Sequence, residues 1–211
     1  MTELYIIRHG RTVWNAAGKI QGSADIELTE DGRMGAVLTG EAWEKAGLHF
    51  DAVYSSPLKR AYATALLVSD YTGLTVNRED RLRELNFGVL EGQSFEHIQD
   101  ADFDPDHGCF FTHPELYKRP DGGESLEELC ARAASFLSDL LSKYKDGQRV
   151  LIVAHGAMNK ALMLTLKHGE LKDFWAGQLQ KNCGVNIVRV ADGKCTIVEE
   201  GRVYFDPEVI R

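Results

Sequence analysis

The sequence has no long apolar run, no basic segment and no paired cysteines, and each absence excludes a class of protein. No apolar stretch approaches the roughly 18 residues that a membrane-spanning helix needs. The net charge is -8, and lysine and arginine form no run, which argues against a nucleic-acid ligand. The amino terminus shows neither a basic segment nor a cleavage site, so no targeting signal is predicted. We therefore expect neither a membrane nor a nucleic acid as a partner.

Cysteine usage indicates a reducing compartment. The four cysteines are scattered and form no Cys-x-x-Cys pair: Cys109, Cys130, Cys183 and Cys195. In a chain of 211 residues this spacing is typical of reduced cytosolic thiols rather than of a disulfide framework. With 44% hydrophobic residues, the chain can bury a core without disulfides or a structural metal. We predict a single domain, residues 1–211, in the cytoplasm.

Short apolar strands alternate with helical segments along most of the chain, which predicts an α/β sandwich with a mostly parallel sheet. Strands are predicted at residues 4–7, 51–55, 74–76, 149–154, 185–190 and 195–199. Helices are predicted at residues 29–46, from Ser56 onward, at 125–144 and at 157–167. Asp192-Gly193 separates the last two strands and is a hairpin signal, so this pair should be antiparallel.

Two buried strands from opposite ends of the chain end in the same dipeptide. The first runs into Arg8-His9-Gly10, and residues 149–154 run into His155-Gly156. Because ligands bind outside the carboxyl ends of parallel strands, neighbouring strands would bring both histidines to one edge of the sheet. The alternative for each is an ordinary strand end whose polar side chains are solvated.

Arg60 and Glu84 are the other candidates. Arg60 falls in the first turn of the helix that follows Ser56-Pro57, where a cation conflicts with the helix dipole. A bound anion would remove that conflict, whereas a solvent-facing arginine is the alternative. Glu84 lies in a loop-like stretch, residues 81–92, and is either a functional acid or a surface carboxylate paired with a neighbouring arginine.

Residues 93–121 form the irregular part of the sequence and are predicted to be a lid-like insertion. His107-x-Cys109-x3-His113 permits a metal cluster, but no fourth ligand has zinc spacing and the aspartates do not match a calcium loop. No metal site is therefore predicted. Three phenylalanines suggest an apolar wall or the core of the lid: Phe103, Phe110 and Phe111. Trp175 is interpreted as a packing residue.

These polar residues would have a clear chemical logic if they met at one site. Two arginines can hold a phosphate dianion through paired hydrogen bonds. A neutral imidazole can attack phosphorus near pH 7, and a second histidine can donate to the equatorial oxygens. A carboxyl group can protonate the leaving alkoxide and then deprotonate the attacking water. None of these steps needs a metal or another cofactor.

Several separated motifs, taken in order, resemble the signature of the histidine phosphatase (phosphoglycerate mutase-like) superfamily over nearly the whole chain. The motifs are LYIIRHGRTVWN at 4–15, Gln21-Gly22, Leu28-Thr29, SSPLKRA at 55–61, Glu84 with Phe87-Gly88, Gly122-Gly123-Glu124-Ser125 and VAHG at 153–156. The resemblance implies a three-layer α/β/α sandwich with one antiparallel edge strand. It also implies a transient phosphohistidine on His9 and proton transfer by Glu84.

The same resemblance assigns the remaining site residues. Arg8, Arg60 and His155 would complete the phosphate pocket, and Asn15 would add its side-chain amide. The substrate entrance would be lined by Gln21, Gly22, Gly156 and Ala157.

Three departures from the family pattern favour hydrolysis over transfer to a second phosphate acceptor. Mutases of this superfamily usually read Glu-Arg-His-Tyr-Gly at the acid loop and His-Gly-Asn-Ser at the second histidine. Here Glu84-Leu85-Asn86-Phe87-Gly88 and His155-Gly156-Ala157-Met158 stand at these places, and residues 93–121 are acidic rather than basic. We predict a metal-independent phosphomonoesterase that hydrolyses a small phosphorylated metabolite. A cofactor-dependent phosphoglycerate mutase and a non-catalytic phosphate-binding module are the alternatives, and a homodimer is left open.

Overall fold

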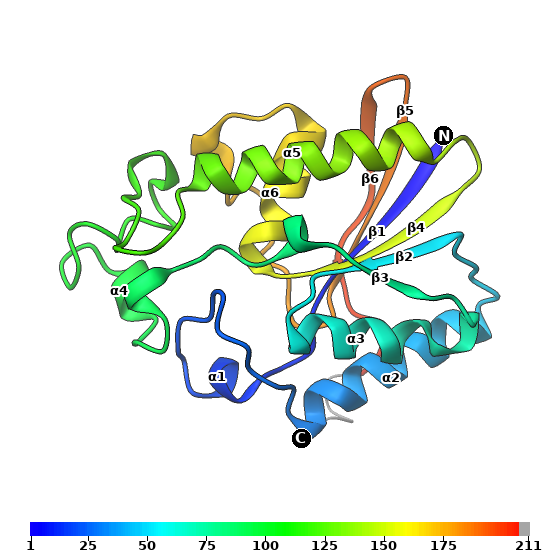
Figure 1. Ribbon diagram of the computed structural model, residues 1–211, viewed down its shortest axis with the longest axis horizontal. Coiled ribbons are helices and arrows are strands. Elements are labelled where there is room, and N and C mark those ends of the chain that lie inside the picture. The colour runs from blue at the N-terminus through cyan, green and yellow to red at the C-terminus, as the bar shows by residue number, and fades with distance from the viewer. Residues whose placement is uncertain (207–211) are drawn as a thin grey trace.

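A six-stranded sheet forms the centre of the computed structural model, which describes residues 1–206 (Figure 1). The strand order is β3-β2-β4-β1-β5-β6. In chain order the strands are β1 (Thr2–Arg8), β2 (Ala52–Ser55), β3 (Val76–Arg78), β4 (Arg149–Ala154), β5 (Val185–Ala191) and β6 (Lys194–Arg202). Residues 207–211, which the single predicted domain includes, lie outside the described residues.

The sheet is mostly parallel, as predicted. β1 pairs in parallel with β4, and β2 pairs in parallel with both β4 and β3. β5 runs antiparallel to β1, and β6 runs antiparallel to β5. The antiparallel strand therefore lies one place in from the edge, because the hairpin adds β6 outside it. Asp192 and Gly193 have φ values of 49° and 72°, as the tight turn of such a hairpin requires.

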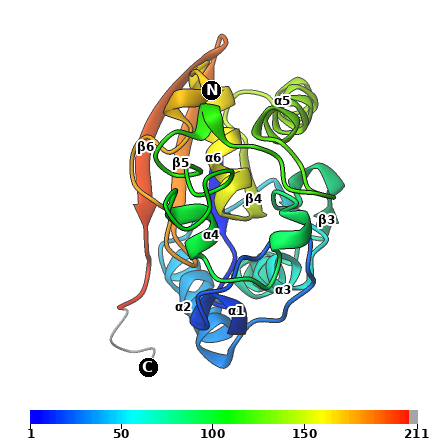
Figure 2. The ribbon, with the colours of Figure 1, turned by 90° about the vertical axis from the view of Figure 1, so that its left-hand side faces the viewer.

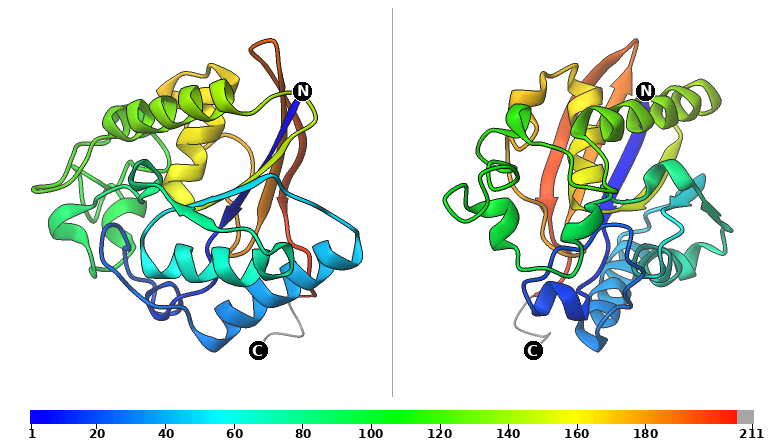
Figure 3. Two further views of the ribbon diagram at one scale, coloured as in Figure 1. Left: turned by 45° about the vertical axis from the view of Figure 1, so that its right-hand side comes forward. Right: turned by 60° about the vertical axis from the view of Figure 1, so that its left-hand side comes forward.

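Helices cover both faces of the sheet and give the predicted three-layer sandwich (Figures 1 and 3). The helices are α1 (Val13–Ala16), α2 (Glu30–Lys45), α3 (Lys59–Ser69), α4 (Glu96–Gln99), α5 (Leu126–Lys143) and α6 (Gly156–Lys167). Short 3-10 helices lie at Asp70–Thr72, Asp80–Leu82, Gly88–Leu90, Pro114–Leu116 and Leu171–Asp173. Side chains alternate along β1, so Ile6 packs with Leu137 of α5, and Ile7 packs in the core that contains Ala65 of α3.

Helix caps explain where two of the long helices begin. The Thr29 side chain accepts the N–H of Gly32 at the start of α2. Ser125 and Glu128 form a capping box at the start of α5. Each cap satisfies backbone N–H groups that the first turn of a helix leaves without partners.

Two predicted boundaries are wrong. α3 begins at Lys59 rather than near Ser56, because the Ser56 side chain contacts His155 and Leu58 is the N-cap residue. β3 covers Val76–Arg78 instead of residues 74–76, because its parallel register places Val76 opposite Val53 of β2. Neither contact is visible in the local sequence pattern.

The carboxyl ends of three central strands meet at one end of the sheet. Arg8 lies opposite Ala154, and Ser55 lies opposite Val153, so the residue after each strand stands at the same edge. The segment 93–121, which includes α4, lies at this end of the molecule (Figure 2). Its action as a lid stays a prediction. Within residues 1–206, no helix is both long and apolar enough to cross a membrane.

Candidate active site

His9 follows β1 directly and is buried, with 3% of its surface exposed. Its Nδ1 lies 2.7 Å from the carbonyl oxygen of Gly10. Because a carbonyl oxygen can only accept, Nδ1 carries the proton and Nε2 keeps a free lone pair. Burial, followed by the charges of Arg60 and Arg8, holds the pKa of His9 well below its usual range. The imidazole is therefore neutral at pH 7, as a nitrogen nucleophile must be.

The backbone around His9 is held by other segments of the chain. Asn182 donates through Nδ2 to the carbonyl oxygen of His9 at 3.0 Å. The N–H of Gly10 donates to the hydroxyl of Thr64 at 2.9 Å. A Cβ atom at Gly10 would collide with the carbonyl group of Gly32, so only glycine fits this close approach. The imidazole is thus fixed before any ligand binds.

His155 follows β4 and lies against His9, with the two ring centroids 5.1 Å apart. Its Nε2 lies 2.8 Å from the hydroxyl oxygen of Ser56, which also accepts the N–H of Leu58 at 3.3 Å. Nδ1 is buried and has no partner among the described residues. Burial, followed by the charge of Arg60, holds the pKa of His155 well below its usual range. When Ser56 donates to Nε2, Nδ1 carries the proton and can donate it to an anion.

Arg60 places a fully buried guanidinium group, and Arg8 a half-buried one, beside the histidines. The terminal nitrogens of Arg60 donate to the carbonyl oxygens of Ala24 and Gly22, each at 2.7 Å. Arg8 donates to the carbonyl oxygen of Gln180 at 2.8 Å. The Nε of each arginine is buried and has no partner within residues 1–206. Burial lowers the pKa of Arg60 to about 10, so it remains a cation at pH 7, and its solvent-facing alternative is wrong.

Glu84 presents its carboxylate to the N-terminus of α6. Oε1 accepts the N–H groups of Leu85 at 2.9 Å and Met158 at 3.0 Å, and Oε2 accepts the N–H of Ala157 at 3.2 Å. The side chain is buried, with 7% of the residue exposed. Free N–H groups and the dipole at a helix N-terminus favour a carboxylate there. Glu84 is therefore held in place by backbone rather than by an arginine.

The surface alternative for Glu84 is wrong. Arg81 pairs with Glu79 at 2.8 Å and with Asp139 at 2.6 Å. Arg83 pairs with Asp80 at 2.9 Å. Both neighbouring arginines thus have other carboxylate partners, and Glu84 lines the pocket instead.

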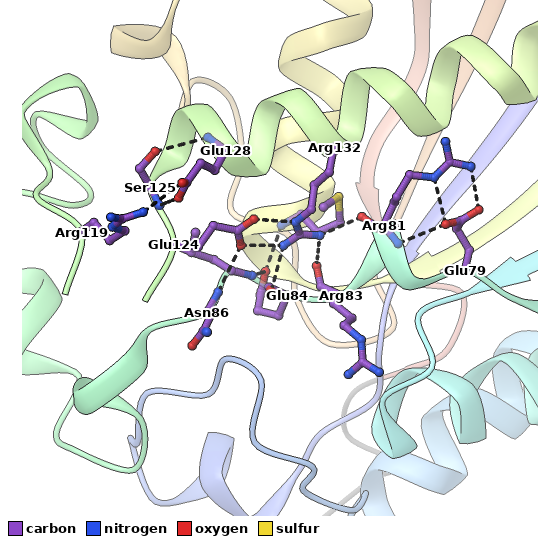
Figure 4. Close-up of polar contacts among 12 residues, drawn as sticks. Glu79, Arg81, Arg83, Glu84, Asn86, Arg119, Glu124, Ser125, Glu128 and Arg132 are labelled. Carbon is purple, nitrogen blue, oxygen red and sulfur yellow. Dashed lines mark hydrogen bonds and ion pairs between the residues drawn. The ribbon is translucent and has the colours of Figure 1, made fainter. Parts of the chain in front are cut away.

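Arg132 of α5 fastens the loop that carries Glu84 (Figure 4). Its Nη2 donates to the carbonyl oxygen of Glu84 at 2.9 Å, and its Nη1 donates to those of Arg81 and Arg83 at 2.7 and 2.5 Å. Glu124 accepts from Nε at 2.7 Å and from Nη2 at 2.9 Å. The guanidinium therefore ties three carbonyl groups within residues 81–84 to α5, and Glu124 orients it.

A pocket of about 520 Å³, part of which is open to solvent, lies beside His9. Its polar side is lined by Arg8, His9, Asn15, Gln21, Glu84, Gly156 and Ala157. The remaining lining residues are apolar: Phe87, Phe95, Ile98, Phe110, Phe111, Trp175 and Leu179. Gln21 is buried, and neither its Oε1 nor its Nε2 has a partner within the described chain. Its amide is therefore available to a ligand.

Three predicted site residues do not line the pocket. Arg60 and His155 are fully buried and act on it through their closeness to His9. Gly22 contributes its carbonyl oxygen to Arg60 instead of a surface at the entrance. A Cβ atom at Gly22 would come within 2.6 Å of the Leu85 carbonyl oxygen, so this glycine permits the close packing of two loops.

The 93–121 segment contributes a wall and no metal cluster. Phe110 and Phe111 line the pocket, whereas Phe103 is 54% exposed and packs edge-on against His97 at 4.8 Å. His107 contacts Asp104 at 3.0 Å. Within residues 1–206, no group of three or more potential ligands could hold a metal ion.

Some functional supports were not identified from the sequence. The sequence does not indicate that Ser56 contacts His155, and Trp175, which is predicted to be a packing residue, also lines the pocket. The role of Arg132 could not be predicted from neighbouring residues, because the carbonyl groups that it contacts lie 48 to 51 residues earlier in the chain. The Glu124 that orients it stands in a family motif, and that motif could have prompted a search for a basic partner on the same helix.

Comparison with known proteins identifies the family. The model of the histidine phosphatase superfamily (branch 1) matches residues 4–202. The chain belongs to this superfamily. A metal-independent phosphoserine phosphatase of Arabidopsis thaliana is 36% identical over 200 residues, covering 93% of this chain and 80% of the relative. The structure of Bacillus stearothermophilus YhfR has a TM-score of 0.86 at 32% identity, covering 96% of this chain and 98% of YhfR.

Mutases of the superfamily are also similar to this chain. A 2,3-bisphosphoglycerate-dependent phosphoglycerate mutase of Cytophaga hutchinsonii is 35% identical over 173 residues, covering 79% of this chain and 78% of the mutase. The superfamily match and the phosphatase relatives confirm the predicted class, a histidine-phosphatase-type phosphomonoesterase.

Proposed function

We propose that this histidine phosphatase hydrolyses a small phosphomonoester in two steps through a phosphohistidine on His9. In the first step Nε2 of His9 attacks phosphorus, a P–N bond forms and the bond between phosphorus and the alcohol oxygen breaks. In the second step water attacks phosphorus, the P–N bond breaks and inorganic phosphate leaves. The supporting observation is the hydrogen bond from Nδ1 to Gly10, which leaves the lone pair on Nε2.

The buried cations supply the charge that the phosphate requires. Arg8 and Arg60 are positive and both histidines are neutral, so the groups around the phosphate carry positive charge in a chain whose net charge is -8. Arg8 and Arg60 each retain an Nε donor, and His155 retains Nδ1. Fixed donors in a water-poor site stabilise the developing charge on the phosphoryl oxygens. Asn15 and Gln21 add amide groups at the pocket surface.

Glu84 is assigned the proton transfers. In the first step the carboxylic acid form of Glu84 gives its proton to the leaving alcohol oxygen and becomes a carboxylate. As a base it then takes a proton from the attacking water in the second step. Its position on the pocket surface, held by three backbone N–H groups, supports both roles. The cycle as proposed needs no metal ion.

Hydrolysis is favoured over mutase activity by the chemistry of the pocket. A bisphosphorylated intermediate needs cations for a second phosphate group. Among the described residues that line the pocket, Arg8 is the only one with a permanent positive charge, and the wall away from His9 is apolar. We therefore assign water as the acceptor of the phosphoryl group.

The test is hydrolysis of p-nitrophenyl phosphate in the presence of a metal chelator. We expect turnover by the unmodified chain and a loss of at least about 10³-fold in His9→Ala, because removal of a nucleophile removes the covalent path. His49→Ala is the matched control, since His49 is exposed. Full activity of His9→Ala, or activity that disappears with chelator, contradicts the proposal. If the enzyme instead interconverted 3- and 2-phosphoglycerate faster than it hydrolysed them, and 2,3-bisphosphoglycerate stimulated this reaction, it would be a mutase.

A further inference from the structure

The part of the pocket beyond the phosphate-binding groups is built from aromatic side chains. Phe111 lies between Phe95 and Trp175, with ring centroids 6.0 Å from the first and 4.6 Å from the second. Behind it, Phe110 and Ile98 are each only 1% exposed. The front rings are half-buried and face a pocket that is large enough for a small ligand.

This aromatic wall offers no hydrogen-bonding group to a ligand. Trp175 carries its one polar side-chain atom, and that Nε1 donates to the carbonyl oxygen of Phe110 at 2.6 Å. Phe87 and Phe110 pack edge to face at 5.4 Å and complete the wall on the side of Glu84. An anionic or uncharged polar group placed against these rings would lose its water without gaining a hydrogen-bond partner, which is unfavourable.

The charged groups of the pocket are already assigned to the reaction. Arg8 is required by the phosphate, and Glu84 by the proton transfers. A substrate such as phosphoserine would bring a further carboxylate and an ammonium group, and no further charged side chain among the described lining residues can pair with either. Another cation, Lys19, lines a second pocket that shares Arg8, Asn15 and Phe95 with the first.

We propose that the substrates of this enzyme are phosphomonoesters of apolar alcohols, with an aromatic ring or a similarly flat apolar group seated against Phe95, Phe111 and Trp175. This proposal rests on the proposed function of the site. The phosphate binds beside His9, the ester oxygen faces Glu84, and the apolar group displaces water from the aromatic wall. Aromatic side chains favour such contacts through offset and edge-to-face packing. This substrate class differs from phosphoserine, after which several of the relatives are named.

The test compares kcat/KM for benzyl phosphate, ethyl phosphate and O-phosphoserine. All three are alkyl esters, and benzyl alcohol is no better a leaving group than serine, so a preference for benzyl phosphate reports the pocket. We expect benzyl phosphate to exceed both others by at least about tenfold, as apolar pockets typically discriminate. Equal or faster hydrolysis of O-phosphoserine overturns the proposal, and loss of that activity in Lys19→Ala would locate the competing subsite.

Two variants distinguish the loss of substrate contacts with the aromatic wall from a general effect on the fold. Phe111→Ala should lower the ratio of kcat/KM for benzyl phosphate to that for ethyl phosphate by about tenfold. Phe103→Ala is the matched control in the same segment, because Phe103 is exposed and does not line the pocket. An unchanged ratio in Phe111→Ala refutes the proposal. If the enzyme hydrolyses ethyl phosphate through His9 without preferring benzyl phosphate, only the substrate class is wrong; if no ester is hydrolysed, the proposed function is wrong.

Discussion

Replacement of Glu84 by glutamine should separate the two proton transfers from binding. Glutamine has nearly the same shape, and its single oxygen can still accept the N–H groups of Leu85 and Met158. Its amide nitrogen would face the N–H of Ala157 and leave that donor without an acceptor. One buried donor without a partner costs about 1–3 kcal/mol, so the variant should fold with a modestly lower free energy of unfolding.

The loss of activity in Glu84→Gln should depend on the leaving group. General acid catalysis contributes roughly 10²- to 10⁴-fold, or about 3–5 kcal/mol of activation free energy, when the departing oxygen needs a proton. An alkyl phosphate should therefore lose roughly this much in kcat/KM. p-Nitrophenolate leaves without a proton, so the phosphorylation step with p-nitrophenyl phosphate should be nearly unaffected. The second step, in which Glu84 activates water, should still be slow.

Rapid-quench kinetics with p-nitrophenyl phosphate provide the assay. We expect Glu84→Gln to release about one equivalent of p-nitrophenolate in a burst and then to turn over slowly, with phosphoenzyme accumulating. Equal losses of kcat/KM with alkyl and aryl phosphates, and no burst, would refute the assignment of Glu84 as acid and base. Thermal unfolding of the variant serves as the control for structural damage.

The remaining predictions concern a support residue and the effect of pH. Arg132→Met should lower kcat/KM for alkyl phosphates by up to about 10²-fold, and for aryl phosphates by less, because the loop that carries Glu84 loses three hydrogen bonds between its carbonyl groups and Arg132. Arg119→Met, which breaks an exposed ion pair with Glu128, is the control and should leave kcat/KM unchanged. Because the pKa of His9 is lowered in the folded chain, below about pH 6.5 this side chain binds a proton in the unfolded chain but not in the folded chain. The free energy of unfolding should therefore fall with falling pH, by up to about 1.4 kcal/mol per pH unit. Urea titrations in phosphate-free buffer between about pH 7.5 and 5.5 should show a shallower decline in His9→Gln, and identical slopes would contradict the burial of a neutral imidazole.

Much of the fold could be predicted because its signals are local. Each signal comes from residues that are close together in the chain: the buried apolar strands, the helix starts at Thr29 and Ser125, and the Asp192-Gly193 turn. The structure confirms these elements. The start of α3 and the position of β3 could not be predicted in the same way. Both depend on contacts between distant strands, such as that of Ser56 with His155.

The same difference between local signals and distant contacts applies to the candidate site. His9 and His155 could be placed together because parallel strands end at one edge, and their rings do lie 5.1 Å apart. The tautomer of His9, in contrast, follows from one contact with the Gly10 carbonyl oxygen, which only coordinates reveal. Trp175 joins the pocket because its indole bonds to Phe110, 65 residues away in the chain.

Trapping of the phosphoenzyme tests the central claim most directly. The enzyme is mixed with ³²P-labelled p-nitrophenyl phosphate, quenched in alkali within one turnover, and digested for peptide mapping. The proposed mechanism predicts an acid-labile, alkali-stable phosphoryl group on Nε2 of His9, absent from His9→Ala and retained in greater amount by Glu84→Gln. A label on another residue, or hydrolysis by His9→Ala at the rate of the unmodified chain, would contradict the mechanism.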